Sequence, residues 1–266
     1  MSTPTVINSV ISWDKNSKME ETLHLISEEP LSIRIQGKAY SVIMRTPGEE
    51  IDHVAGFCLA EGIVDTTDDI ETISFCNEED TNVVTVTVKP SRRSKIASIM
   101  DRRGFVSQTS CGICGKELAE DLFQTIQPVT SEKRINKAKA LACLEDLSTK
   151  QPLRKQTKAS HAAAIYNADF ELLSIAEDVG RHNALDKAIG KLFLKNRLSE
   201  ISLLILSSRI SYELVQKAAR ARIPAILSVS RPTSLAVELA MKLQISMACF
   251  APHDGLYIFD NQNRFK

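Results

Sequence analysis

Apolar and polar positions alternate in short runs near the start of the chain. Residues 31–36 alternate strictly, and a second apolar run at 40–44 follows after Gly37-Lys38. A two-residue link with a leading glycine suits a type II′ turn, which joins adjacent antiparallel strands. The pattern therefore predicts an early β-hairpin.

The hydrophobic spacing next becomes helical. Pro47 and two glutamates open a helix, and Gly62 closes it. The elements expected after it are strands at 70–76 and 82–88 and a short basic helix at 91–103. The order ββαββα predicts a small α+β domain over residues 1–105.

From about residue 131 strands alternate with helices. The expected helices lie near 135–142 and at 181–194, 211–221 and 234–243. The expected strands are the two arms of a hairpin at 162–166 and 171–176, and then 201–206, 225–229, 246–250 and 256–259. Such alternation indicates right-handed βαβ crossovers and a mostly parallel sheet covered on both faces. We therefore expect an α/β domain over residues 131–266, connected to the first domain by a loop and linking helix over 106–130.

Composition narrows the class of protein. The 266 residues are 43% hydrophobic and 25% charged, enough to bury a sizeable core. Basic and acidic residues number 33 each, so no overall field attracts nucleic acid or an anionic membrane. The N-terminus lacks a signal-peptide pattern, and no apolar run reaches the length of a membrane span. We expect a soluble cytoplasmic protein, in which the six cysteines stay thiols, metal ligands or catalysts.

Cys111 and Cys114 form the one cysteine pair with chemically informative spacing. Glycines follow both, and the helical pattern after them places the pair at or just before a helix N-terminus, which favours the nucleophilic thiolate. The pair could therefore be a reactive dithiol or a sulfur carrier. The same spacing could supply half of a structural zinc site, although no second half is evident among the other cysteines, Cys58, Cys76, Cys143 and Cys249.

Three turns in the second half share a design, in which an arginine stands between a strand and a helix. The turns are 177–183, 207–211 and 228–234. In an open parallel sheet such turns lie on one carboxyl edge, where helix N-termini and arginines bind phosphate. We therefore predict a site for a phosphate-bearing ligand. The alternative is that Asp178, Ser211 and Thr233 merely cap helices and the arginines are solvated.

His161 and His182 invite comparison with zinc deaminases. The deaminase signature places Glu two residues after the histidine and a Pro-Cys pair further on. Here Ala163 and Ala184 hold the Glu positions, and the chain contains no Pro-Cys dipeptide. These residues argue against deaminase chemistry, and either histidine could be structural.

Four segments resemble the FdhD/NarQ family, and the likeness covers nearly the whole chain. They are SCGICG at 110–115, EDVGRHNALDKAIG at 177–190, VQKAA at 215–219 and PTSLAVELA at 232–240. The resemblance implies a cytidine-deaminase-like three-layer α/β domain with a smaller N-terminal α+β domain. It also implies a cytoplasmic sulfurtransferase that takes persulfide sulfur from a cysteine desulfurase. The sulfur goes to the molybdenum cofactor, bis(molybdopterin guanine dinucleotide), before insertion into the formate dehydrogenase apoenzyme.

The resemblance also implies roles for individual residues. Cys111 bears the persulfide, and Cys114 relays sulfur or resolves the persulfide. The residues expected to contact the guanine-nucleotide-bearing cofactor are Phe250, Ala251, Pro252, His253, Asp254, Gly255, Arg181, His182, Ser208, Arg209, Ser230 and Arg231. We expect a homodimer with no metal ion of its own, no nucleic acid and no membrane as a partner. The competing functions are a non-catalytic chaperone that binds the molybdenum cofactor and a zinc-stabilised adaptor.

Overall fold

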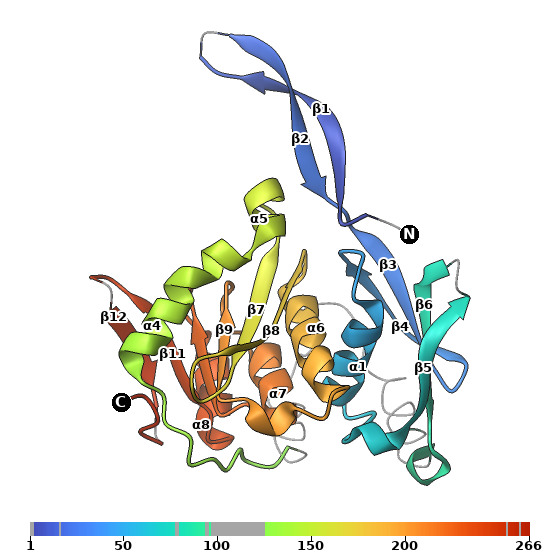
Figure 1. The fold of residues 1–266 in the computed structure, drawn as a ribbon, viewed down its shortest axis with the longest axis vertical. Helices are drawn as coiled ribbons and strands as arrows, with labels where there is room; N and C mark the ends of the chain where they lie inside the picture. Colours follow the sequence, from blue (N-terminus) through green and yellow to red (C-terminus); the bar gives the residue numbers. More distant parts are fainter. Residues whose placement is uncertain are drawn as a thin grey trace.

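A six-stranded mixed sheet forms the centre of the fold (Figure 1). The computed structural model describes residues 3–15, 17–77, 80–93, 96, 126–253, 255–260 and 262–266. The strand order is β12-β11-β10-β9-β7-β8, and the strands are β7 (His161–Tyr166), β8 (Leu172–Asp178), β9 (Leu203–Leu206), β10 (Ala225–Ser228), β11 (Ser246–Ala251) and β12 (Gly255–Phe259).

The central strands β9, β10 and β11 are parallel, as predicted. The hairpin expected from the strands at 162–166 and 171–176 is confirmed, because β7 pairs antiparallel with β8. The expectation of a mostly parallel sheet is wrong where β12 pairs antiparallel with β11 and β7 pairs antiparallel with β9. A short hairpin loop joins β11 to β12, and such loops join only antiparallel neighbours. The hairpin of β7 with β8 likewise reverses β7 relative to β8, so β7 also runs antiparallel to β9. The α/β class itself is confirmed.

Helices cover both faces of this sheet. They are α4 (Lys137–Asp146), α5 (Pro152–Thr157), α6 (Arg181–Phe193), α7 (Tyr212–Arg220) and α8 (Ser234–Lys242), with 3₁₀ turns at Leu147–Lys150 and Leu198–Glu200. In β9, Leu204 and Leu206 pack with α6, α7 and α8, whereas Leu203 and Ile205 pack with α4. A strand buried on both faces reads as a continuous apolar run, which is the pattern in the sequence. No helix in the described ranges is long and apolar enough to cross a membrane.

A four-stranded sheet and one helix make up the predicted α+β unit. The strands are β3 (Glu29–Ile35), β4 (Lys38–Arg45), β5 (Ile70–Asn77) and β6 (Asp80–Val88), in the order β4-β3-β6-β5, with helix α1 (Glu50–Ala60) and a 3₁₀ turn at Thr67–Asp69. The predicted ββαββ order is confirmed. Of the basic helix expected at 91–103, only residues 91–93 and 96 are described, and they are helical.

The β3–β4 turn differs from the predicted type. Ile35 pairs with Lys38, so the two linking residues are Gln36 and Gly37 rather than Gly37 and Lys38. Both have positive φ, 52° and 76°, which is the type I′ conformation and not type II′. The hairpin was correctly predicted, and its turn begins one residue earlier.

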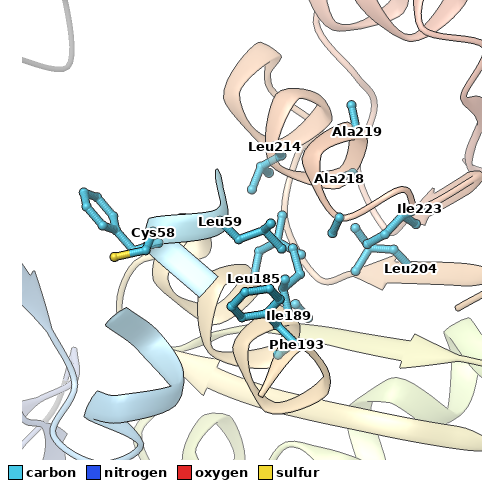
Figure 2. Close-up of a cluster of buried hydrophobic side chains, with 14 of the residues drawn as sticks. Cys58, Leu59, Leu185, Ile189, Phe193, Leu204, Leu214, Ala218, Ala219 and Ile223 are labelled. Atoms are coloured by element: carbon cyan, nitrogen blue, oxygen red, sulfur yellow. The ribbon is translucent and has the colours of Figure 1, made fainter. Parts of the chain in front are cut away.

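Helices α1 and α6 cross in backbone contact. A Cβ added at Gly56 would lie 1.9 Å from the carbonyl oxygen of Asp186, and one added at Gly190 would lie 1.8 Å from that of Asp52. One hydrophobic core therefore runs from the small sheet through α1 into α6 and α7. Figure 2 shows part of it, with Leu59 from α1 beside Leu185 from α6. The domain boundaries given above remain a prediction.

An antiparallel ribbon of two strands, β1 (Thr5–Trp13) and β2 (Lys18–Ile26), extends away from the body of the molecule (Figure 1). The sequence pattern did not reveal it. Alternation marks a strand with one buried face, and this ribbon is exposed along most of both faces. Near its base, Nε2 of Gln156 in α5 lies 2.8 Å from Nδ1 of His24.

Candidate functional site

The three arginine-bearing turns lie on one edge of the six-stranded sheet, as predicted. Cα registers pair Ser228 with both Leu206 and Cys249, so β9, β10 and β11 end together. Asp178 at the end of β8 pairs with His161 at the start of β7, which places both at the same edge. We call this edge the rim and define it as residues 178–183, 207–213, 228–234, 250–253 and 255.

The predicted ligand-binding residues of the first three turns differ in exposure. Arg181 and His182 begin α6 and are half-buried, whereas Arg209 is exposed. Arg231 is also exposed, and its guanidinium carbon lies 5.4 Å from the centre of the Tyr257 ring. Two hydroxyl residues stand directly before the exposed arginines: Ser208, which is buried, and Ser230, which is half-buried.

The fourth part of the rim is the turn between β11 and β12. Phe250 is 37% exposed, Ala251 is buried, and Pro252 and His253 are exposed. His253 has a φ of 59°, a left-handed conformation that is uncommon for a residue other than glycine. Gly255 begins β12, and Asp254 lies outside the described residues.

Cys111 and Cys114 also lie outside the described residues. Of the cysteines that the structure does describe, Cys58 and Cys249 are buried and Cys143 is half-buried. Burial raises the thiol pKa of all three above the ordinary value, so these thiols stay protonated and poorly nucleophilic.

The carboxylate of Asp178 holds the first turn in place. It accepts hydrogen bonds from the backbone N–H of Gly180 at 2.9 Å, from Nδ2 of Asn183 at 2.9 Å and from the N–H of Thr46 at 3.1 Å. Nζ of Lys187 lies 2.7 Å from the same carboxylate. Gly180 is the N-cap of α6, so Asp178 does not cap this helix and instead holds the turn before it.

Thr46 ties the N-terminal half of the chain to this turn. Its hydroxyl oxygen accepts from the N–H of Val179 at 3.0 Å, and its carbonyl accepts from Nζ of Lys187 at 2.8 Å. Neither Thr46 nor Lys187 was predicted as a site residue. The only signal was a lysine among the apolar residues of α6, a position where burial requires a partner.

His182 joins the first two turns. Its Nε2 lies 3.3 Å from Oγ of Ser211 and 3.5 Å from Oε2 of Glu213, and the Ser211 hydroxyl donates to Glu213 at 2.8 Å. Hydrogen bonding from His182, supplemented by that from Ser211, lowers the pKa of Glu213 to about 2 against the effect of burial. The Ser211 side chain thus binds Glu213 and does not cap α7, whereas Thr233 does cap α8 by accepting from Ala236 N.

His161 is a neutral base at the rim. Burial lowers the pKa of its imidazole, and the charges of Arg154 and Arg181 lower it further. Its Nδ1 and the Nε of Arg181 are buried and have no hydrogen-bond partner within the described part of the chain. Both groups are therefore available to a ligand that reaches the start of α6.

The charges favour an anion. Asp178 is held by Lys187, and Glu213 by His182. The Glu177 carboxylate is likewise engaged, because it accepts from two backbone N–H groups at the start of α5 and from the Ser160 hydroxyl. With these acids already engaged, the rim arginines can offer bidentate hydrogen bonds to phosphate oxygens.

Comparisons with known proteins agree with the resemblance. The model of the FdhD/NarQ family matches residues 26–266. A protein of Mycobacterium tuberculosis named sulfur carrier protein FdhD is 35% identical over 266 residues, covering 96% of this chain and 95% of its own length. One of the same name from Corynebacterium efficiens is 37% identical over 236 residues, 84% of each chain.

A solved structure shares the fold. It is the crystal structure of a candidate formate dehydrogenase accessory protein from Desulfotalea psychrophila, with a TM-score of 0.78 over 98% of this chain and 99% of that one, at 21% identity. The family model matches well over half of the chain, and the curated relatives match nearly all of it. The chain belongs to the FdhD/NarQ family.

Proposed function

We propose that this protein is a sulfurtransferase that carries persulfide sulfur on Cys111 from a cysteine desulfurase to the molybdenum cofactor. The cofactor, bis(molybdopterin guanine dinucleotide), is its cargo and binds at the rim. The observation that carries the proposal is the convergence of Arg181, Arg209 and Arg231 on one edge of the sheet. Family membership supports the sulfur chemistry, since the relatives are named sulfur carrier proteins.

The rim suits the guanosine diphosphate ends of such a cargo. Exposed Arg209 and Arg231 bind the pyrophosphate oxygens, and N–H groups at the start of the rim helices add donors. The exposed ring of Tyr257, which lies beside the Arg231 guanidinium, offers a stacking surface to a guanine base. Arg181 supplies a further donor at the start of α6, and His161 at the start of β7 supplies another in its Nδ1–H tautomer.

The sulfur steps balance with the two cysteines and an external thiol reductant. The Cys111 thiolate attacks the outer sulfur of the donor's persulfide, the donor's S–S bond breaks, and the donor thiolate leaves. Cys111 then carries the S–S bond. Attack of the Cys114 thiolate on the inner sulfur of this persulfide forms a Cys111–Cys114 disulfide and releases hydrosulfide for the molybdenum. Two thiols are oxidised as one sulfane sulfur is reduced, and an external thiol reductant resets the pair.

The proposal also places the protein among partners. It works in the cytoplasm as a homodimer, receives sulfur from a cysteine desulfurase and serves the formate dehydrogenase apoenzyme. Assignment of the layered α/β core to the cytidine-deaminase-like fold remains a prediction from the resemblance.

Mass spectrometry of the protein after incubation with a desulfurase and cysteine tests the proposal. The wild type should gain about 32 Da, one sulfur atom, on the peptide that contains Cys111. Cys111→Ser should abolish the gain, whereas Cys76→Ser, a change at an exposed cysteine of β5, should leave it intact. Cys114→Ser should retain the persulfide, because release then lacks its attacking thiol.

The chaperone function makes a different prediction. A protein that only binds the molybdenum cofactor would bind guanosine diphosphate at the rim and gain no sulfur. If the wild type binds guanosine diphosphate but gains no mass, the protein carries the cofactor and does not transfer sulfur. A gain that persists in Cys111→Ser would show that another cysteine is the carrier.

A further inference from the structure

A carboxylate orients the histidine at the start of α6. Within the described part of the chain, the hydrogen-bond and ion-pair contacts of the His182 ring all use Nε2, which lies 3.3 Å from Oγ of Ser211 and 3.5 Å from Oε2 of Glu213. The Ser211 hydroxyl donates to the same Oε2 at 2.8 Å. The hydrogen bond made by one ring nitrogen decides which nitrogen carries the proton of a neutral imidazole. Nε2 therefore keeps its proton beside the carboxylate, and Nδ1 is the nitrogen that can exchange a proton with a ligand.

The same residue types form the catalytic triad of serine hydrolases, but the arrangement differs. In such a triad the carboxylate binds Nδ1 of the histidine, and Nε2 takes the proton of the serine. Here the carboxylate lies at Nε2, and the Ser211 hydroxyl donates its hydrogen bond to Glu213 instead. Ser211 is thus not prepared to act as a nucleophile, and the group that can act on a ligand is His182.

The strand order gives the place of His182 along the rim. Tyr257 in β12 and Arg231 after β10 lie together at one end, and Arg209 follows β9. His182 comes next, because it contacts Ser211 in the turn after β9. Neighbouring strands are about 4.8 Å apart, so β12 and β9 are roughly 14 Å apart. A guanosine diphosphate with its base at Tyr257 and its pyrophosphate at the two arginines therefore directs the rest of the cargo towards His182.

Sulfur transfer to molybdenum needs an acid at this place. When hydrosulfide replaces an oxide ligand, a Mo–S bond forms, the Mo–O bond breaks and the oxide leaves as water. This water takes up two protons: hydrosulfide gives one as it becomes a sulfide ligand, and an acid gives the other. No electrons are exchanged in this step. Histidine suits the task near neutral pH, because imidazole changes its charge between about pH 5 and 8.

We propose that His182 is the acid that protonates the oxide leaving the molybdenum, and that Glu213 and Ser211 are its positioning residues. This inference rests on the proposed function, because it requires the cofactor to bind at the rim. The imidazolium gives up its Nδ1 proton and becomes neutral, with the proton on Nε2 retained. The side chain is 34% exposed, so solvent can return the lost proton after each exchange.

The groups around His182 make Glu213 its electrostatic partner. Asp186, which lies four residues later in α6, is buried and is held in an ion pair by a lysine of α7. His161 in β7 is neutral, because burial lowers its pKa. Arg181, which precedes His182 in the helix, carries a charge of the same sign as the imidazolium. Removing the Glu213 charge should therefore make the imidazolium lose its proton more easily.

A single-turnover measurement of sulfur delivery tests the proposal. The starting sample is protein that carries the persulfide and holds the cofactor with oxygen-ligated molybdenum. X-ray absorption at the molybdenum edge, on samples frozen at successive times, follows the replacement of oxygen neighbours by sulfur. His182→Gln should slow this replacement by roughly 10²- to 10⁴-fold at pH 7, because an amide can donate to Ser211 and Glu213 but cannot supply the proton. The matched control is His24→Gln, a change in β2 outside the rim, which should react at the wild-type rate.

The pH dependence separates proton transfer from a structural role. The wild-type rate should fall as the pH rises and the imidazolium loses its proton, and His182→Gln should show no such fall. Glu213→Gln keeps the hydrogen bonds but removes the negative charge, so its rate should fall at a lower pH than that of the wild type. Imidazole added to His182→Ala should restore part of the lost rate.

Three results would overturn the proposal. They are a wild-type rate in His182→Gln, a fall at high pH that persists in this variant, and a full rate in this variant at saturating cofactor, which would make His182 a binding residue only. Mass spectrometry of the Cys111 peptide reads persulfide formation before delivery begins. A wild type that gains no sulfur therefore contradicts the proposed function, whereas a sulfurated protein that delivers sulfur without His182 contradicts only this inference.

Discussion

Nζ of Lys187 lies 2.7 Å from Oδ2 of Asp178, and neither side chain is more than 2% exposed. The pair sits beneath the rim and fixes the turn that carries Arg181. Replacing Lys187 by Met should leave the buried carboxylate without its cation and lower the free energy of unfolding by about 3–5 kcal/mol. Urea denaturation measures the loss.

The exposed Lys195 of the same segment provides the control for this variant. Lys195→Met should change the free energy of unfolding by less than about 0.5 kcal/mol. Equal effects of the two substitutions would mean that the ion pair does not hold the turn.

The Glu213 carboxyl reports on the contact between the first two rim turns. Its pKa of about 2 depends first on the hydrogen bond from His182 and less on that from Ser211. His182→Ala should raise this pKa toward the ordinary value of 4.5, and Ser211→Ala should raise it less. Titration followed by carbon NMR measures both, and an unchanged pKa in His182→Ala would contradict the geometry of the rim.

The same group contributes to stability in a defined pH range. The folded-state pKa lies below the unfolded-state value, so stabilisation is complete above about pH 4.5 and is lost as the pH falls toward 2. Glu213 is half exposed, so solvent screening should keep the contribution below about 1 kcal/mol. Comparing wild type with Glu213→Gln by urea denaturation at pH 6 and pH 3 should show a smaller difference at pH 3.

Binding of guanosine diphosphate tests the rim arginines. Arg209→Ala and Arg231→Ala should each weaken binding by roughly 10- to 150-fold, the effect of losing one charge-assisted contact. Calorimetry measures the affinities. The matched control is Arg197→Ala, because Arg197 precedes β9, lies at the opposite edge of the sheet and pairs with Glu200. If both rim variants bind guanosine diphosphate as tightly as the wild type does, Arg209 and Arg231 are solvated side chains that do not contact the nucleotide.

Because α1 and α6 cross in backbone contact, replacing a glycine at the crossing by alanine should lower the free energy of unfolding. Gly190→Ala adds one methyl group where the backbone of Asp52 already lies within van der Waals distance, so the helices must separate. The variant should lose about 1–3 kcal/mol of unfolding free energy. In an uncrowded helix the same change would be stabilising, so a raised melting temperature would show that the contact is not tight.

Strands and helices that bury one or both of their faces could be predicted from the sequence. Leu203 to Leu206 read as a strand covered on both sides, and the turns after β8, β9 and β10 were placed on one edge because parallel strands end together. These inferences need only local spacing and the rule that βαβ crossovers are right-handed.

Other features depend on partners distant in the chain. Thr46 and Lys187 meet across 141 residues, and no local pattern pairs a threonine after one strand with a lysine inside a later helix. The type I′ turn at Gln36 was missed because glutamine rarely adopts positive φ, so Gly37 was given the first position. The ribbon gave no signal because neither of its faces is consistently buried by the chain itself.

The glycine contact between α1 and α6 also bears on how the protein is made. Gly56 emerges from the ribosome long before Gly190, and the α1 face that carries it stays uncovered until α6 has been synthesised. Synthesis of the intervening residues at roughly 5–20 per second takes roughly 7 to 27 seconds, during which the apolar side of α1 is open to other nascent chains. Arrest of translation before residue 181 should therefore yield a fragment that requires a chaperone to stay in solution.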